Sequence, residues 1–135
     1  MKELTVKAAL ESAPRVTAFI DEALEALDCP LKAQTQIDVA VDELFSNIAR
    51  YAYPNRDGEA TVRFEFDADA RAVRLTFIDA GLPFDPLKRP DPDVSLSAQD
   101  RQIGGLGIFL VKKTMDDLAY RREGGRNQLT ITKYI

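Results

Sequence analysis

The feature that most restricts the fold is an alternation of apolar and polar residues across positions 60–81, ATVRFEFDADARAVRLTFIDAG. The alternating apolar positions are Val62, Phe64, Phe66, Val73, Leu75 and Phe77. A period of two is that of a strand with one buried face, and a slip of one residue would expose every apolar side chain. Because a polar break at 67–71 separates the two runs, the stretch predicts an antiparallel hairpin.

Two helical patterns precede this hairpin. Ser12 is a candidate N-cap, and Pro14 suits the first turn of the helix that follows, since its missing N–H does no harm there. The first apolar stripe is Val16, Phe19, Ile20, Ala23, Leu24 and Leu27. Cys29-Pro30 ends that pattern, and a second helix is predicted over 32–52. Its stripe is Ile37, Val41, Leu44, Ile48 and either Tyr51 or Ala52.

The remaining segments complete a fold class. Residues 3–8 read as an edge strand, and two closing strands are predicted near 118–123 and 127–134. A helix after the glycine-rich stretch carries Ile108, Phe109, Val111, Lys112, Met115 and Leu118. This order predicts one α+β domain over 1–135, a two-layer sandwich with three helices on one face. Its sheet is expected to be either fully antiparallel or mixed, with most strand pairs antiparallel.

Composition excludes several functions. The chain has no histidine, which removes Ser-His-Asp and Cys-His catalysis, most zinc sites and any phosphoacceptor histidine. A net charge of −4 argues against nucleic-acid binding. No apolar run approaches the roughly 20 residues of a membrane span, and the N-terminus does not resemble a signal peptide. With Cys29 as the only cysteine, we expect an inert thiol and a cytoplasmic protein.

Glu43 and Asn47 stand four residues apart on the second predicted helix, so they project from one face. An asparagine amide oxygen can coordinate Mg²⁺, and a carboxylate one turn earlier can act on a nearby hydroxyl or water. The alternative is a solvated pair on the shoulder of a helix. The basic pairs Lys112-Lys113 and Arg121-Arg122 are interpreted as solvent-facing.

Asp79 ends the hairpin's second strand, and Gly81 follows it in IDAGLPFDP. A carboxylate at a strand end accepts hydrogen bonds from an exocyclic amine, and a glycine lets a flat ring approach the backbone. The alternative is that both residues simply end a strand, which is a common role for them.

A proline-rich segment without periodicity, residues 82–103, leads into IGGLGIFLV at 103–111. A long irregular segment inside a small domain is usually functional or disordered. Gly104, Gly105 and Gly107 open a predicted helix, whose free N–H groups and positive dipole end can hold phosphate without lysine. The alternative is a flexible corner. The stretch matches neither the P-loop nor a complete dinucleotide-binding fingerprint.

Taken in order, these motifs resemble the ATP-binding fold shared by gyrase, Hsp90, histidine kinases and MutL. Within that superfamily the chain is most similar to the small anti-sigma-factor serine/threonine kinases. The matching stretches are VDELFSNIARYAYP, DAGLPFDP, GGLGIFLVKKTMDDLAY and GRNQLTITK. The resemblance extends from RVTAF at 15–19 to the C-terminus.

The resemblance implies a binding site for ATP or ADP with Mg²⁺. Asn47 would be the Mg²⁺ ligand, and Glu43 the base acting on a serine hydroxyl of a protein substrate. Asp79 would bind the adenine amino group, with Gly81 making room for the ring. A lid would span about 86–103. The phosphates would meet the backbone at Gly104, Gly105, Leu106 and Gly107.

The resemblance also implies partners. The substrate would be an anti-sigma-factor antagonist, the sequestered protein a sigma factor or similar regulator, and Arg15 a partner contact. A homodimer is compatible with the pattern. The chain departs from relatives at Tyr51, where histidine is common, at Leu82-Pro83, and at Asn127-Gln128, where a Gly-Thr pair is usual.

Three other functions compete with the kinase. One is a nucleotide-gated binding switch without phosphotransfer, which would keep Asn47, Asp79 and the glycines. Another is a detached histidine-kinase catalytic domain, which needs a histidine-bearing partner. The last is an α+β domain that binds no nucleotide.

Overall fold

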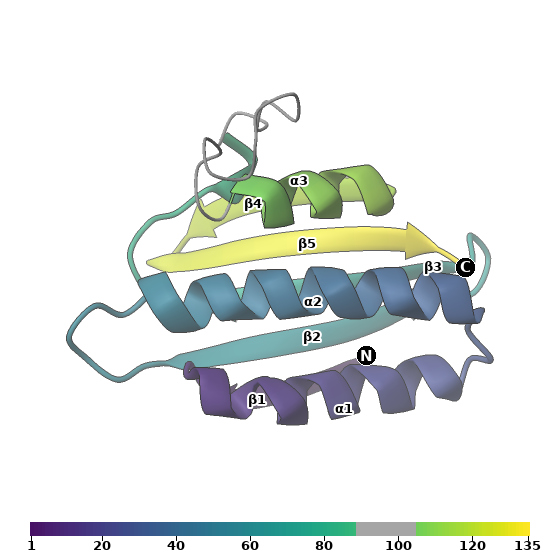
Figure 1. Ribbon diagram of the computed structural model, residues 1–135, viewed down its shortest axis with the longest axis horizontal. Coiled ribbons are helices and arrows are strands. Elements are labelled where there is room, and N and C mark those ends of the chain that lie inside the picture. Colours follow the sequence, from purple (N-terminus) through teal and green to yellow (C-terminus); the bar gives the residue numbers. More distant parts are fainter. Residues whose placement is uncertain (89–104) are drawn as a thin grey trace.

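A computed structural model describes residues 1–88 and 105–135 of the chain, and these form five β-strands and three α-helices (Figure 1). The strands are β1 (Lys2–Lys7), β2 (Glu59–Asp67), β3 (Ala72–Asp79), β4 (Asp117–Glu123) and β5 (Arg126–Tyr134). The helices are α1 (Ala13–Glu25), α2 (Leu31–Tyr51) and α3 (Gly105–Thr114), with short 3-10 turns η1 (Leu10–Ser12) and η2 (Pro86–Lys88).

The strands of the described residues make one sheet in the order β1-β2-β3-β5-β4, and every neighbouring pair is antiparallel. The predicted hairpin is confirmed as β2 and β3. The possibility of a mixed sheet is not realised, because β3 and β4, which run in the same direction, are separated by the antiparallel β5. β3 lies at the centre and is buried along most of its length.

The three helices cover one face of this sheet, as Figure 1 shows. The apolar core lies between the two layers, and its largest fully buried side chains include Phe45, Phe77, Ile20, Leu24, Ile37 and Leu75. The opposite face of the sheet is polar. There, Thr5 and Thr61 share a hydrogen bond of 2.8 Å, and Thr76 and Thr130 share one of 3.0 Å. The α+β sandwich with helices on one face is therefore confirmed.

The first and third helices end earlier than the apolar pattern predicts, since α1 stops at Glu25, before Leu27. α3 stops at Thr114, so Leu118, expected on this helix, lies in β4 instead. The chain leaves the helix because Asp116 N–H donates to Thr132 O at 2.8 Å and so joins β5. Ser12 does take the N-cap position of α1, but its side chain makes no capping hydrogen bond. None of the described helices is long and apolar enough to cross a membrane.

Candidate functional site

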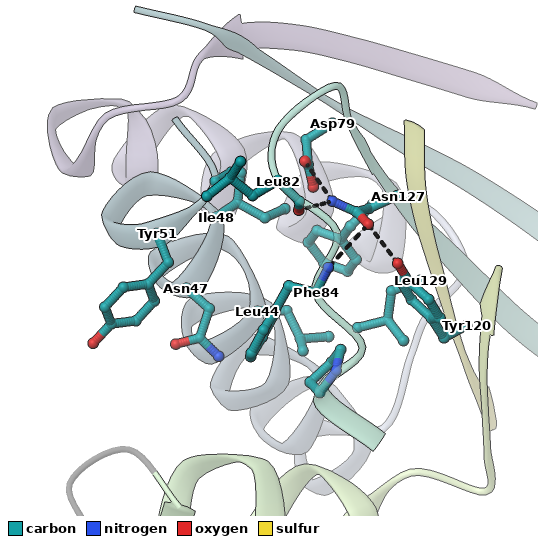
Figure 2. A pocket seen from close by; sticks show the side chains of 13 residues that line it. Leu44, Asn47, Ile48, Tyr51, Asp79, Leu82, Phe84, Tyr120, Asn127 and Leu129 are labelled. Carbon is teal, nitrogen blue, oxygen red and sulfur yellow. Dashed lines mark hydrogen bonds between the residues drawn. The ribbon is translucent and has the colours of Figure 1, made fainter. Parts of the chain in front are cut away.

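A pocket lies where α2 meets one end of the sheet and the chain that follows β3 (Figure 2). Its lining residues are Leu44, Asn47, Ile48, Tyr51, Ala52, Phe77, Asp79, Leu82, Phe84, Pro86, Tyr120, Asn127 and Leu129. Apolar walls with a few polar groups are typical of small-molecule sites.

Strand register places the polar groups of the pocket in one row. Asp79 of β3 is directly opposite Asn127 of β5, and Asn127 is directly opposite Arg122 of β4. One row further into the sheet, Phe77 pairs with Leu129, and Leu129 with Tyr120. Because side chains two positions apart along a strand share a face, both rows point toward the helices. The sheet therefore supplies an apolar floor with a polar end.

Asp79 is the acidic group of that polar end, and only 6% of its surface is exposed. Its Oδ1 accepts hydrogen bonds from Gly81 N–H at 2.9 Å and from Asn127 Nδ2 at 3.0 Å. No hydrogen bond from a described residue reaches Oδ2. The carboxylate thus has one oxygen held by the protein and one able to accept a bond from a ligand amine.

Gly81 is fixed by the end of α2. A Cβ built on Gly81 would lie 2.3 Å from the backbone oxygen of Ala52, and Leu82 N–H donates to that same oxygen at 2.9 Å. Any larger residue would push these two segments apart. Tyr53 adds a second tie, since its hydroxyl donates to Glu59 O at 2.6 Å and accepts from Ala80 N–H at 2.7 Å.

Glu43 and Asn47 lie side by side on α2, as their spacing predicts. Asn47 Nδ2 donates to Glu43 Oε1 at 3.4 Å, and no hydrogen bond from a described residue reaches the amide oxygen of Asn47. The first turn of α3 lies against the same carboxylate, because a Cβ built on Gly107 would be 2.1 Å from Glu43 Cδ. The structure therefore brings together Glu43, Asn47 and Gly107 from two distant parts of the sequence.

Asn47 fits a magnesium ion by its chemistry. Mg²⁺ usually takes one or two protein oxygens and fills its other positions with water and phosphate. The amide oxygen of Asn47, at the pocket, can supply one of these ligands.

The other predicted site residues are placed as follows. Gly105 begins α3, and Leu106 is exposed in its first turn. Gly104 and residues 89–103 of the expected lid lie outside the described residues, while 86–88 form η2. Arg15 is exposed in the first turn of α1 and does not line the pocket.

Sequence reasoning missed two contributors. Asn127, noted only as a departure from relatives, is bonded directly to Asp79. Arg122, interpreted as solvent-facing, is largely exposed, yet its guanidinium donates to Gly81 O at 2.8 Å. The pairing register of β3, β5 and β4 places both Asn127 and Arg122 near Asp79, and a short sequence motif does not specify that register.

The comparisons with known proteins agree with this geometry. Residues 6–133 match the histidine kinase-like ATPase domain family. The chain is 31% identical over 98 residues to the serine/threonine-protein kinase BtrW of Bordetella bronchiseptica, covering 73% of this chain and 68% of that protein. It is 34% identical over 109 residues to the serine-protein kinase RsbW of Listeria monocytogenes, covering 77% and 68%.

A solved structure supports the fold. The crystal structure of the RsbU and RsbW domains of a Mycobacterium tuberculosis protein aligns with a TM-score of 0.66 and 16% identity. The alignment covers 99% of this chain and 32% of that chain. Together with the pocket, these similarities show that the chain belongs to the histidine kinase-like ATPase domain family and is homologous to the RsbW and BtrW serine kinases.

Proposed function

We propose that this protein is an ATP- and Mg²⁺-dependent protein serine/threonine kinase of the anti-sigma-factor type. The observation that carries the proposal is that Asp79 and Asn47 line one pocket, while Gly107 of α3 lies against Glu43, the hydrogen-bond partner of Asn47. Homology to proteins named as serine kinases supports the same reading.

Each end of the pocket has a role in this proposal. At the sheet end, Asp79 Oδ2 accepts a hydrogen bond from the adenine amino group, and the ring lies on the apolar floor beside Gly81. At the helix end, the backbone of Gly104, Gly105 and Gly107 would bind the phosphates, and residues at about 86–103 would act as the lid. Residues 1–135 act as one ATP-binding domain, and ADP binds the same site after transfer.

Glu43 acts as the base that orients and deprotonates a serine hydroxyl of the protein substrate. Asn47 would hold Mg²⁺, which when bound would supply charge neutralisation at the phosphates. Phosphoryl transfer depends chiefly on positioning and charge neutralisation, so a chain without histidine can perform it.

The partners follow from the kinase type. The substrate is a small antagonist protein with an accessible serine, and a sigma factor or similar regulator is held when that antagonist is phosphorylated or absent. The protein would regulate transcription from the cytoplasm without contacting nucleic acid. Arg15, which is exposed, would contact the partner, and the protein would act as a homodimer.

A nucleotide-gated switch is the second candidate, because the Asp79 site needs no transfer chemistry to bind ATP. The two are separated by incubating the protein with γ-labelled ATP, Mg²⁺ and an antagonist-type protein. The kinase predicts label on an antagonist serine. The switch predicts ATP-dependent retention of a partner without label, and that result would overturn the kinase assignment.

A further inference from the structure

Asn127 has more hydrogen-bond partners than any other side chain described at the pocket. Its Nδ2 donates to Asp79 Oδ1 at 3.0 Å and to Leu82 O at 2.7 Å. Its Oδ1 accepts from the Tyr120 hydroxyl, from Phe84 N–H at 3.3 Å and from Arg122 Nη1 at 3.2 Å. Both amide hydrogens are therefore used, and only 6% of the residue is exposed.

This set of partners fixes the direction of the amide. A rotation by 180° would turn Oδ1 toward the acceptors on Asp79 and Leu82 (Figure 2). It would also turn Nδ2 toward the N–H donors of Phe84 and Arg122, so these four bonds would be lost. The strand register holds the residue in place, since Asn127 lies directly opposite Asp79 in β3 and Arg122 in β4. Asn127 therefore presents a fixed N–H donor to Asp79.

We infer that Asn127 is a positioning residue that sets the purine specificity of the pocket through Asp79. This inference rests on the proposed nucleotide site. By holding Oδ1 together with Gly81 N–H, Asn127 stops the carboxylate from rotating and directs Oδ2 as an acceptor toward the base. A 6-amino purine donates to that oxygen, whereas a 6-oxo purine places a second acceptor against it.

The bonds to Leu82 and Phe84 extend this role to the wall of the pocket. Both residues line the site and follow Gly81 in sequence. Asn127 donates to the backbone oxygen of Leu82 and accepts from the backbone N–H of Phe84. Loss of the amide would release the carboxylate and the wall together. Discrimination between the two purine classes should then fall, because an unheld carboxylate can turn away or admit water.

The test compares ATP with inosine triphosphate, which carries oxygen in place of the amino group. Affinity for each nucleotide is measured by calorimetry, with Mg²⁺, on wild type, Asn127→Ala and the nearly isosteric Asn127→Asp. The second variant keeps the shape but replaces the donor with an acceptor, and it serves if Asn127→Ala does not fold. Gln128→Ala is the matched control, because it removes the neighbouring amide, which bonds Arg121 on the other side of β5. Thermal unfolding of each variant is recorded alongside.

We expect wild type and Gln128→Ala to prefer ATP by about tenfold or more, a typical effect of one charge-assisted hydrogen bond. In both Asn127 variants that ratio should fall at least threefold, mainly through weaker ATP binding. Parallel losses that leave the ratio unchanged would overturn the inference while leaving the nucleotide site standing. Equal binding of both nucleotides by wild type would also overturn it. Binding of neither nucleotide by wild type would overturn the proposed function itself, and the inference with it.

Discussion

The two ends of the pocket are built differently. At the sheet end, Asp79 is fixed by strand pairing, by the backbone N–H of Gly81 and by Asn127. At the helix end, Asn47 lines the pocket and donates a hydrogen bond of 3.4 Å to the neighbouring Glu43, which lies against the first turn of α3. The sheet end is therefore suited to recognising a rigid base, and the helix end can adjust as phosphate and substrate arrive.

Gly81 and Gly107 show the same difference between a rigid and an adjustable surrounding. A Cβ on Gly81 would meet backbone atoms of Ala52, which cannot move without shifting α2 or the chain after β3. A Cβ on Gly107 would meet the far end of the Glu43 side chain, which can rotate away. The first glycine protects the fold of the site, and the second protects the position of one carboxylate.

The largest effect is expected from Glu43→Gln. A general base contributes about 10²- to 10⁴-fold to rate, so phosphotransfer to the antagonist should fall by that factor. ATP affinity should change little, because the substitution leaves Asp79 and the rest of the adenine site unchanged. Asp42→Asn, an exposed neighbour on α2, is the control. An unchanged transfer rate in Glu43→Gln would show that the base is assigned wrongly.

Gly81→Ala should weaken the fold most. Forcing a methyl group against fixed backbone typically costs about 1–3 kcal/mol, so the free energy of unfolding in urea should fall by that amount. ATP binding should weaken as well, since Asp79 and Leu82 would both be displaced. Unfolding at the wild-type urea midpoint would contradict the close approach to Ala52.

Gly107→Ala should have the opposite profile. Its free energy of unfolding should stay within about 1 kcal/mol of wild type, because alanine favours the helix while the carboxylate moves aside. Phosphotransfer should fall by about tenfold, the result of a displaced base. Combined with Glu43→Gln, the substitution should cause no further loss of rate. A larger destabilisation than that of Gly81→Ala would reverse the comparison of the two ends.

The smallest expected effect is a change in the pH dependence of stability at Asp38 on α2, which does not line the pocket. Burial raises the pKa of Asp38 to about 7, and hydrogen bonding with Asp21 and the charges of Asp21 and Glu25 add to the rise. Its Oδ1 is buried without a hydrogen-bond partner among the described residues. A raised pKa means that the folded state keeps a proton that the unfolded state releases, so stability falls as pH rises from about 4 to about 7.

Asp38→Asn should remove this dependence. Since Asp38 is only half-buried, solvent screening reduces the gain to about 1 kcal/mol at pH 8, with little difference at pH 4. Urea unfolding across this pH range measures it, with Asp42→Asn as the exposed control. Equal stabilisation at both pH values would show that the carboxyl does not titrate as described. Nucleotide binding should be unaffected, which separates general stability from the pocket.

Local patterns predicted much of this molecule. The period-two runs located β2 and β3, and helical spacing located α1 and α2 with Ile37, Val41 and Leu44 buried. Glu43 and Asn47 are neighbours because helix geometry requires it. These predictions succeed because the interactions that decide them lie within a few residues of one another.

The rest depends on contacts between distant segments. Whether α3 continues to Leu118 is decided by pairing of Asp116 with Thr132 in β5. The position of Asn127 against Asp79 requires the register of two strands whose residues are 48 positions apart. Tyr53 reaches Ala80 across a turn and a hairpin. No short motif encodes such juxtapositions, so the network around Asp79 appears only in the folded chain.

The most direct test of a pocket with these two ends is calorimetry of ATP binding, with and without Mg²⁺, on wild type, Asp79→Ala and Asn47→Ala. We expect wild type to bind ATP more tightly with Mg²⁺. Asp79→Ala should lose about tenfold or more in affinity under both conditions, since a charge-assisted hydrogen bond is removed. Asn47→Ala should lose mainly the gain from Mg²⁺. Absence of ATP binding by wild type under both conditions would contradict the account.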